Sequence, residues 1–240
     1  MGKIEQPKRL DIGKAMENVK RNMIYRGIER WTGLLNYNED DLRDFMRRIG
    51  ESYVPGFVLD NENAGVYENV RKWADARPFS CLDPNNPNVV IPGDPKKGLY
   101  ICGPTGSGKT LLLSVIRAYL IALYAKIKIG DQIENLTWES RRSDEICVEY
   151  AKTGDLEQFL SARVLCIQDI GSEQKETLYM GNRVEVIRTI LEYRGDRTNL
   201  ITILTANDRI LDGVYGTRVQ SRLCEMCNYF ELTGKDRRLR

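Results

Sequence analysis

The stretch Gly98-Leu-Tyr-Ile-Cys-Gly-Pro-Thr-Gly-Ser-Gly-Lys-Thr110 decides the fold of this 240-residue chain. Its first part is an apolar run typical of a buried strand, and its second part matches the pattern G-x-x-x-x-G-K-[ST]. A strongly apolar helix is predicted directly after it, over residues 109–126. Strand, glycine-rich turn and helix in this order are the context that a phosphate-binding loop requires. The sequence therefore predicts a P-loop at residues 103–110.

Each residue type in this loop has a chemical reason to be there. Glycines let backbone N–H groups curl around phosphates, and the N-terminus of the following helix adds a partial positive charge. Lys109 is expected to neutralise the β and γ phosphates, and the Thr110 hydroxyl is expected to hold Mg²⁺. We therefore predict ATP or ADP with Mg²⁺ as cofactors, bound by Gly103, Pro104, Thr105, Gly106, Ser107, Gly108, Lys109 and Thr110.

The composition limits the chemistry that the chain can perform. It contains no histidine, which excludes Ser-His-Asp triads, imidazole zinc ligands and acid–base catalysis by histidine. Lysine and arginine number 36 and aspartate and glutamate 34, so the net charge of +2 directs no large field at nucleic acid or membrane. Catalysis must then use carboxylates, lysine, arginine, amides and a bound metal.

Nothing in the sequence is typical of a membrane span or a secretion signal. The start of the chain is basic and polar, and Ser114 and Arg117 interrupt the most apolar stretch, residues 111–125. We expect a cytoplasmic protein with no membrane partner. Cys224 and Cys227 have the C-x-x-C spacing of a redox dithiol, but no second pair exists to close a zinc site. Two reduced, half-buried thiols are the alternative interpretation.

The sequence pattern divides the chain near residue 57. Residues 1–56 are predicted to form a helical N-terminal region, and residues 1–30 have eight basic and four acidic side chains. This excess suits either a solvated helix face or a docking surface for an acidic partner or for DNA phosphates. Residues 57–240 contain a helical pattern over 61–79 and then strands at 98–102, 164–167, 200–204 and 229–232, separated by further helical patterns. They predict an α/β domain with a parallel sheet between helices.

Polar residues follow two of the predicted strands. Gln168 and Asp169 come after 164–167, and Asn207 ends the run Leu-Ile-Thr-Ile-Leu-Thr-Ala-Asn. Ligands of parallel sheets bind at the carboxyl ends of the strands, so these side chains are expected beside the P-loop. Arg218 and Arg222 lie on a predicted helix before the last strand, where surface salt bridges are their ordinary role.

Together these elements resemble the AAA+ ATPases, and within them the helicase-loader group of DnaC and the transposon ATP-binding protein IstB. The resemblance covers about residues 57–238. It depends on the P-loop stretch, on Asp169-Ile-Gly-Ser-Glu173 and on Tyr215-Gly-Thr-Arg-Val-Gln-Ser-Arg-Leu223, and Gly234-Lys-Asp-Arg-Arg238 is similar to the close of the group. It implies a P-loop AAA+ core without a C-terminal helical lid, because few residues follow Arg222.

The resemblance also implies roles for single residues. Asn207 looks like the sensor that polarises the attacking water, and Arg222 looks like an arginine finger acting on a neighbouring subunit's nucleotide, with Arg218 in reserve. A finger in trans implies a nucleotide-dependent homo-oligomer. With Lys109 and Asp169, these residues make up the predicted catalytic set.

One position departs from the family pattern of two adjacent carboxylates at the end of the acidic strand. The favoured register puts Gln168 in the first place, beside Mg²⁺, and Asp169 in the second, as the base. A register shifted by one residue makes Asp169 the metal acid and leaves Ile170 at the base position. In either register one carboxylate is missing, so we expect weak Mg²⁺ affinity or slow hydrolysis, with Thr110 and Asp169 as the metal-binding residues.

Three functions remain open from the sequence. The first is an ATPase that loads a replicative helicase, with the basic N-terminal region holding the helicase and the core assembling on single-stranded DNA. The second is a nucleotide-gated binding module with little hydrolysis. The third is an IstB-like ATP-binding protein that recruits a transposase. We see no aromatic platform for DNA bases, since Trp31, Trp73 and Trp138 are expected to be core or interface anchors.

Overall fold

The strand that leads into the P-loop lies in the middle of a seven-stranded sheet in the computed structural model. The structure describes residues 13, 16–17, 28–31, 37–207, 212–234 and 236, and the side chains of Trp31, Asp212 and Gly213 are outside the description. The sheet has the order β3-β2-β12-β4-β11-β8-β7. Its parallel part consists of β12 (Cys227–Glu231), β4 (Gly98–Cys102), β11 (Ile201–Ala206), β8 (Val164–Ile170) and β7 (Ser140–Arg142).

Two short strands extend this sheet beyond β12. They are β2 (Ser80–Leu82) and β3 (Val90–Pro92), which pair antiparallel to each other and to β12. Among the five parallel strands, β4 and β11 are buried along their whole length, which explains their continuous apolar sequences. The predicted parallel α/β fold is therefore confirmed.

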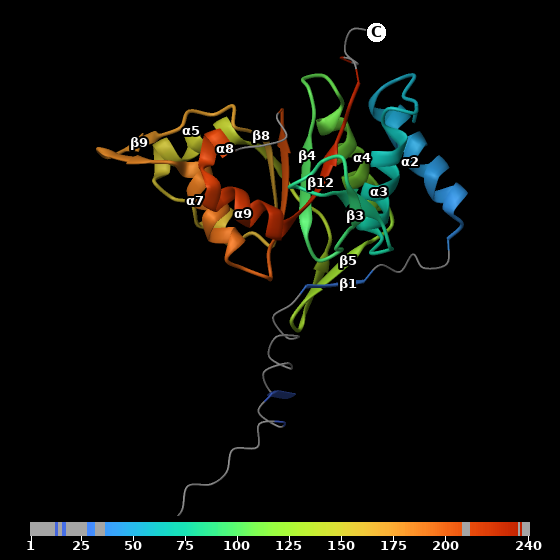
Figure 1. Cartoon of the computed structure of the whole chain (residues 1–240), viewed down its shortest axis with the longest axis horizontal. Helices are drawn as coiled ribbons and strands as arrows, with labels where there is room; N and C mark the ends of the chain where they lie inside the picture. Colours follow the sequence, from blue (N-terminus) through green and yellow to red (C-terminus); the bar gives the residue numbers. More distant parts are fainter. Residues whose placement is uncertain are drawn as a thin grey trace, which may run out of the picture.

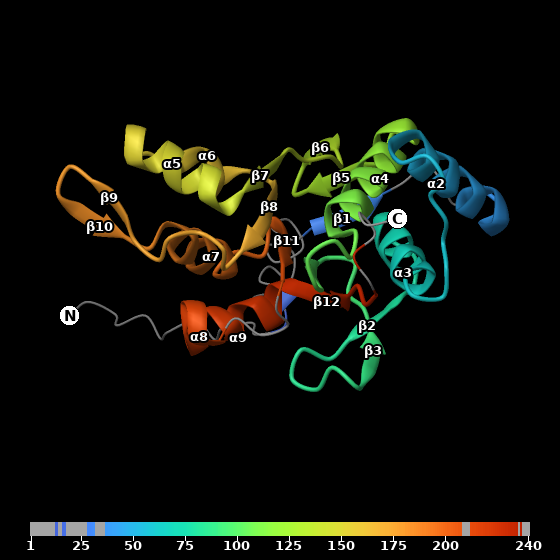
Figure 2. The ribbon, with the colours of Figure 1, turned by 90° about the horizontal axis from the view of Figure 1, so that it is seen from above.

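Helices cover both faces of the sheet (Figure 1, Figure 2). One layer contains α2 (Glu39–Tyr53), α3 (Ala64–Ala74) and α4 (Lys109–Ala122). The other contains α5 (Ser143–Thr153), α6 (Glu157–Ser161), α7 (Val186–Gly195), α8 (Asp212–Tyr215) and α9 (Thr217–Met226). Each layer has its own buried apolar cluster against the sheet.

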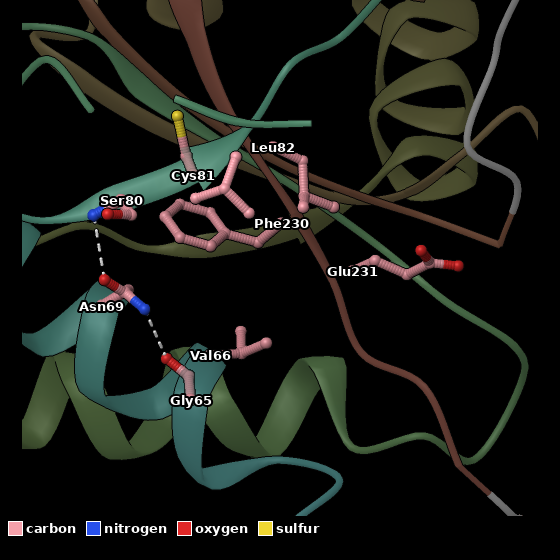
Figure 3. Close-up of a pocket in the computed structure, with 9 residues that line it drawn as sticks. Gly65, Val66, Asn69, Ser80, Cys81, Leu82, Phe230 and Glu231 are labelled. Atoms are coloured by element: carbon pink, nitrogen blue, oxygen red, sulfur yellow. Dashed lines mark hydrogen bonds between the residues drawn. The ribbon is translucent and has the colours of Figure 1, made fainter. Parts of the chain in front are cut away.

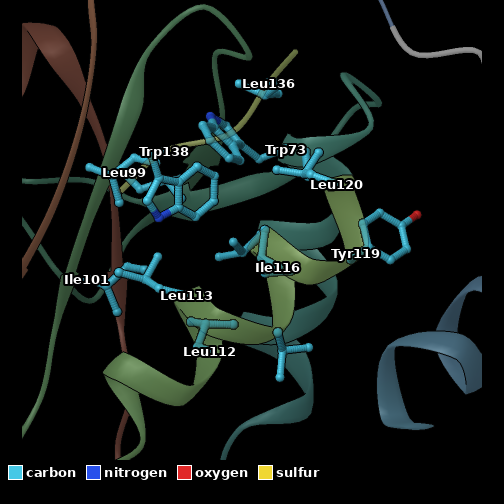
Figure 4. Close-up of a cluster of buried hydrophobic side chains, with 14 of the residues drawn as sticks. Trp73, Leu99, Ile101, Leu112, Leu113, Ile116, Tyr119, Leu120, Leu136 and Trp138 are labelled. Carbon is cyan, nitrogen blue, oxygen red and sulfur yellow. The ribbon is translucent and has the colours of Figure 1, made fainter. Parts of the chain in front are cut away.

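The core below the P-loop is built on α4. Leu112, Leu113 and Ile116 pack against Leu99 and Ile101 of β4 (Figure 4). Trp73 and Trp138 are buried in the same cluster, so the expectation that they are anchors is confirmed, whereas the side chain of Trp31 lies outside the described residues. None of the helices in the described ranges combines the length and apolarity needed to cross a membrane.

The predicted helical N-terminal region is only partly helical. Helix α2 begins at the cap residue Asn38, whose side chain accepts a hydrogen bond from Asp40 N at 2.8 Å, and three acidic residues fill its first turn. Its buried residues Leu42 and Met46 join the apolar cluster of α4. The helix prediction is wrong at β1 (Ile28–Trp31), and most of residues 1–27 lie outside the description.

Strand β1 belongs to a separate small sheet. It pairs antiparallel with β5 (Lys126–Ile129), which pairs with β6 (Gln132–Asn135). The sequence predicted a helix up to residue 126. Helix α4 instead ends at Ala122, and the last residue of the predicted helix, Lys126, begins β5. A last hairpin, β9 (Thr177–Tyr179) and β10 (Asn182–Val184), projects from the α5 side of the molecule (Figure 1). The domain boundary at residue 57 stays a prediction.

Candidate nucleotide-binding site

The predicted phosphate-binding loop joins the end of β4 to the start of α4. Its three glycines have left-handed or otherwise positive φ, at 150° for Gly103, 79° for Gly106 and 99° for Gly108. A Cβ atom at Gly103 would lie 2.2 Å from the backbone oxygen of Leu232, so both conformation and space require glycine there. The loop opens at the N-terminus of a 14-residue helix, where backbone N–H groups have no helical partner.

Lys109 lies under this loop with 6% of its surface exposed. Its Nζ donates to the backbone oxygens of Gly103 at 2.7 Å and Pro104 at 3.1 Å, and to Oδ1 of Asn207 at 3.0 Å. Asn207 follows β11, so the structure brings the predicted sensor onto the predicted P-loop lysine. Because Asn207 accepts through Oδ1, its Nδ2 group is left to act as a donor at this edge of the sheet.

Thr110 and Gln168 meet at the next position along the same edge. Oγ1 of Thr110 donates to Oε1 of Gln168 at 3.1 Å, and Gln168 is 9% exposed at the end of β8. The structure therefore places the amide of Gln168 beside the P-loop hydroxyl. Two neutral oxygens suit a hydrated Mg²⁺ that keeps most of its water and phosphate ligands. Within the described ranges, no three carboxylate or thiol groups are arranged to hold a metal on their own.

Asp169 sits in a left-handed conformation, with φ of 55°. Such a conformation costs a non-glycine residue about 1–3 kcal/mol and persists where the surroundings fix it. Here Asp169 N donates to Oγ1 of Thr205 at 2.9 Å, and the Asp169 carbonyl accepts from Oγ of Ser143 at 2.9 Å and of Ser172 at 2.6 Å. Three hydroxyls from separate segments thus fix the backbone of the predicted base.

The charge of Asp169 acts on a cation on the neighbouring strand, Arg142. A hydrogen bond to Asp144, and then the charges of Asp144 and Asp169, hold the pKa of Arg142 above its usual value. Arg142 ends β7 and is the register partner of Gln168. Its place beside β8 comes from strand pairing, which no local sequence pattern indicates.

The turn after Asp169 is connected to α8 by Tyr215. The Tyr215 hydroxyl donates to Oε1 of Glu173 and accepts from Gly171 N at 2.9 Å. Burial, followed by the charge of Glu173, raises the pKa of Tyr215 far above its usual value, so the phenol stays protonated. Glu173 and Tyr215 were both in motifs that the sequence singled out, but nothing in their spacing indicated this contact.

The two candidate finger arginines lie on α9. Arg222 donates from Nε at 3.1 Å and from Nη2 at 2.5 Å to Oδ1 of Asp196, just after α7. Arg218 is exposed and forms no ion pair in the part of the chain that the structure describes. Neither arginine is brought onto Lys109, which agrees with a role on another subunit and does not test it.

The segment after β12 runs past the loop and was missed by sequence analysis. Leu232 N donates to the Cys102 carbonyl at 2.8 Å, directly before the loop. Further along, Asp236 covers Gly106, where an added Cβ would lie 2.0 Å from Oδ1 of Asp236. This explains why Gly106 is confined by neighbours as well as by its backbone angle.

The two cysteines of the C-x-x-C pair have no role at this edge of the sheet. Cys224 and Cys227 are free thiols, and burial raises the pKa of Cys227 to about 12, which favours the interpretation as reduced thiols.

A cavity of about 130 Å³ lies between α3, β2 and β12 (Figure 3). Its amide Asn69 is satisfied, accepting from Ser80 N at 2.9 Å and donating to the Gly65 carbonyl at 2.8 Å.

Comparison with known proteins gives structural likeness only. No protein-family model matches the chain, and no curated protein matches it in sequence. The DnaC helicase loader is similar with a TM-score of 0.49 and 20% identity, over 79% of this chain and 99% of that one. DnaI is similar with a TM-score of 0.46 and 20% identity, over 81% and 93%.

A third similar structure is DnaA from Aquifex aeolicus bound to AMPPCP, with a TM-score of 0.46 and 20% identity, over 73% of this chain and 48% of that one. At these identities the likeness concerns the arrangement of strands and helices. The chain itself has an α/β fold with a mostly parallel sheet flanked by helices, and DnaC, DnaI and DnaA are structures to which it is similar.

Proposed function

We propose that the chain is a Mg-ATP-dependent AAA+ ATPase that serves as a helicase loader or replication accessory ATPase. The observation that supports ATP binding is the meeting of Lys109, Thr110, Gln168 and Asn207 at one edge of the sheet. These four residues come from one helix, α4, and from the carboxyl ends of two strands, β8 and β11, and they meet at a glycine-rich loop, as a phosphate-binding site requires. The loading role rests on the sequence resemblance to the DnaC and IstB group.

The residues at this edge have separable tasks in such a reaction. Bound Mg-ATP would supply the phosphoanhydride bond that is cleaved. The loop N–H groups and Lys109 Nζ bind and neutralise the phosphates, while Thr110 orients the metal through its hydroxyl. Asn207 Nδ2 orients the attacking water, and the Asp169 carboxylate accepts its proton. The strained backbone of Asp169 supports this role, because hydrogen bonds from separate segments hold its main chain in place at the end of β8.

Assembly and partners complete the proposal. Arg222 would leave Asp196 and reach the nucleotide of a neighbouring subunit in a homo-oligomer. The basic residues 1–30 would bind the replicative helicase, and the assembled cores would bind single-stranded DNA.

A second function is favoured by one contact. Because Thr110 bonds to a neutral amide, the metal position gains no negative charge from Gln168. ATP could then hold an oligomer together without rapid turnover, as a nucleotide-gated binding module. Retained ATP binding without hydrolysis, in the presence of DNA and partner, is its signature.

The test is the rate of phosphate release from Mg-ATP by the full chain, with and without single-stranded DNA. Lys109→Ala is the control for contaminating ATPases. We expect turnover that increases with DNA and disappears in the control. Binding without turnover selects the gated module, and absence of both binding and turnover contradicts the proposal.

A further inference from the structure

A polar cavity of about 370 Å³ lies between α4 and the edge strand β7, next to the candidate nucleotide site. This volume is within the range of small-ligand pockets. Gln168 belongs to both places, since it lines the cavity and accepts the hydrogen bond of Thr110. The residues that line the cavity are Tyr53, Leu113, Ser114, Arg117, Glu139, Ser140, Arg141 and Gln168.

Arg117 supplies a cation to this cavity. It is half-buried on α4, and its Nε donates to the backbone carbonyl of Trp138. Among the residues that the structure describes, Arg117 has no ion-pair partner. A guanidinium has five N–H donors, so its terminal groups remain available to an anion.

One neutral group beside Arg117 is also suited to an anion. Gln168 accepts from Thr110 through Oε1, which leaves its Nε2 amide as a donor. A carboxylate at this position would repel an anion, whereas the amide does not. Ser114 on α4 and Ser140 on β7 also line the cavity. Their hydroxyls donate to Thr110 O at 2.9 Å and to Cys166 Sγ at 3.4 Å, so they add no donor for an anion.

Two charged residues flank Ser140 in the lining of the cavity. Arg141 pairs with Glu149 and lies 6.0 Å from the Phe159 ring, so its charge is already engaged. Glu139 is exposed, so water and salt screen its charge more than that of the half-buried Arg117.

Tyr53 gives the cavity an aromatic rim. It is the last residue of α2, and its side chain is 51% exposed. An aromatic ring beside a cationic groove is the combination that binds an unstacked base together with its phosphate. The lining serines, Ser114 and Ser140, and Leu113 add no charge to the cavity.

We propose that this cavity binds one nucleotide unit at a second site, with its phosphate at Arg117 and Gln168 and its base against Tyr53. The same chemistry is present in a free nucleotide and in one nucleotide of a single strand. A base held in a duplex is stacked and paired and does not reach the ring. Since Gln168 also bonds to Thr110, occupation of the P-loop and of this cavity is coupled through one side chain.

The experiment uses the full chain with its P-loop saturated by Mg-ADP. Fluorescence anisotropy measures the affinity for labelled oligo(dT) at several salt concentrations, and calorimetry measures binding of dTMP. The variants are Arg117→Gln and Tyr53→Leu. The matched control is Arg197→Gln, because Arg197 is also half-buried and donates to one backbone carbonyl, that of Tyr193 at 2.5 Å, on the far helix layer.

We expect Arg117→Gln to lower the slope of log affinity against log salt by about 0.7, as loss of one single-strand phosphate contact requires. Tyr53→Leu should weaken oligo(dT) binding by about tenfold at an unchanged slope. Binding of dTMP that competes with oligo(dT) assigns the site to free nucleotides, and binding of oligo(dT) alone assigns it to a strand. If neither dTMP nor oligo(dT) binds, the proposal is wrong. It is also wrong if Arg117→Gln and Tyr53→Leu bind oligo(dT) with the same affinity and salt dependence as Arg197→Gln. Tyr53 is exposed, so its variant reports even if Arg117→Gln fails to fold.

Discussion

At the scale of single residues, Gln168 decides how fast the proposed ATPase can work. Its amide oxygen is 3.1 Å from the Thr110 hydroxyl, and in the register that we favour it takes the place of a carboxylate of the AAA+ pattern. We predict that Gln168→Asp raises the rate of ATP hydrolysis on the order of tenfold, about 1.4 kcal/mol in the barrier. The physical reason is the negative charge that aspartate adds next to the metal. Phosphate release at saturating Mg-ATP measures the effect.

Gln168→Asn is the matched control, because asparagine has the size of aspartate and the neutrality of glutamine. It should not raise the rate. An unchanged rate in Gln168→Asp, with ATP binding intact, would count against the register that places Gln168 beside the metal.

At the scale of elements, one buried arginine joins α6, α7 and β11. Arg194 is 1% exposed and donates to the backbone oxygens of Phe159, Leu160, Ala162 and Ile201 and to Oγ1 of Thr202, at 2.7–3.4 Å. Burial lowers the pKa of its guanidinium to about 10. No carboxylate pairs with it in the described ranges, so four carbonyl dipoles and the Thr202 hydroxyl offset its charge.

We predict that Arg194→Met lowers the free energy of unfolding by about 3 kcal/mol or more, because buried carbonyls lose their donors. Arg194→Lys keeps the charge but has fewer donors in another geometry, and should fall between methionine and the native residue. Urea unfolding followed by circular dichroism measures both. A methionine variant within about 1 kcal/mol of the native protein would show that water replaces the guanidinium.

Elements with their own apolar pattern could be predicted from the sequence, and elements defined by distant pairing could not. Strands β4, β8 and β11 could be predicted because each contains a continuous apolar run that is buried in the structure. By contrast β7 is Ser-Arg-Arg, a three-residue edge strand that exists because it pairs with β8. The helix prediction is wrong at β1 because its partner strand, β5, lies about a hundred residues further along the chain.

The candidate site shows the same division. Lys109, Thr110, Gln168 and Asn207 were expected at one edge because each follows a recognisable strand or loop, and the structure places them in contact. Their catalytic roles stay predictions. The hydroxyls that fix Asp169 and the contact of Tyr215 with Glu173 depend on side-chain packing between α8, β11 and α5, which no local pattern encodes.

At the scale of the whole molecule, the proposed reaction requires two subunits. We predict that Lys109→Ala and Arg222→Ala are each inactive alone and that an equal mixture regains about a quarter of native ATP turnover. In a mixed ring, about a quarter of interfaces combine an intact P-loop with an intact finger. Phosphate release as a function of mixing ratio measures this.

Arg218→Ala mixed with Lys109→Ala tests the reserve candidate in the same way. A mixture of Lys109→Ala and Arg222→Ala that remains inactive, although both variants bind to native subunits, would remove Arg222 from the trans role.

The pairing of β1 with β5 has a consequence for the order in which the protein is made. Residues 28–31 leave the ribosome long before Lys126–Ile129, the strand that receives them. At about 5–20 residues per second, roughly 5–20 s of synthesis separate the two. Throughout that interval this part of the nascent chain has no strand to pair with. A partner that binds the basic N-terminal residues can therefore engage them during translation, before the sheet that anchors them exists.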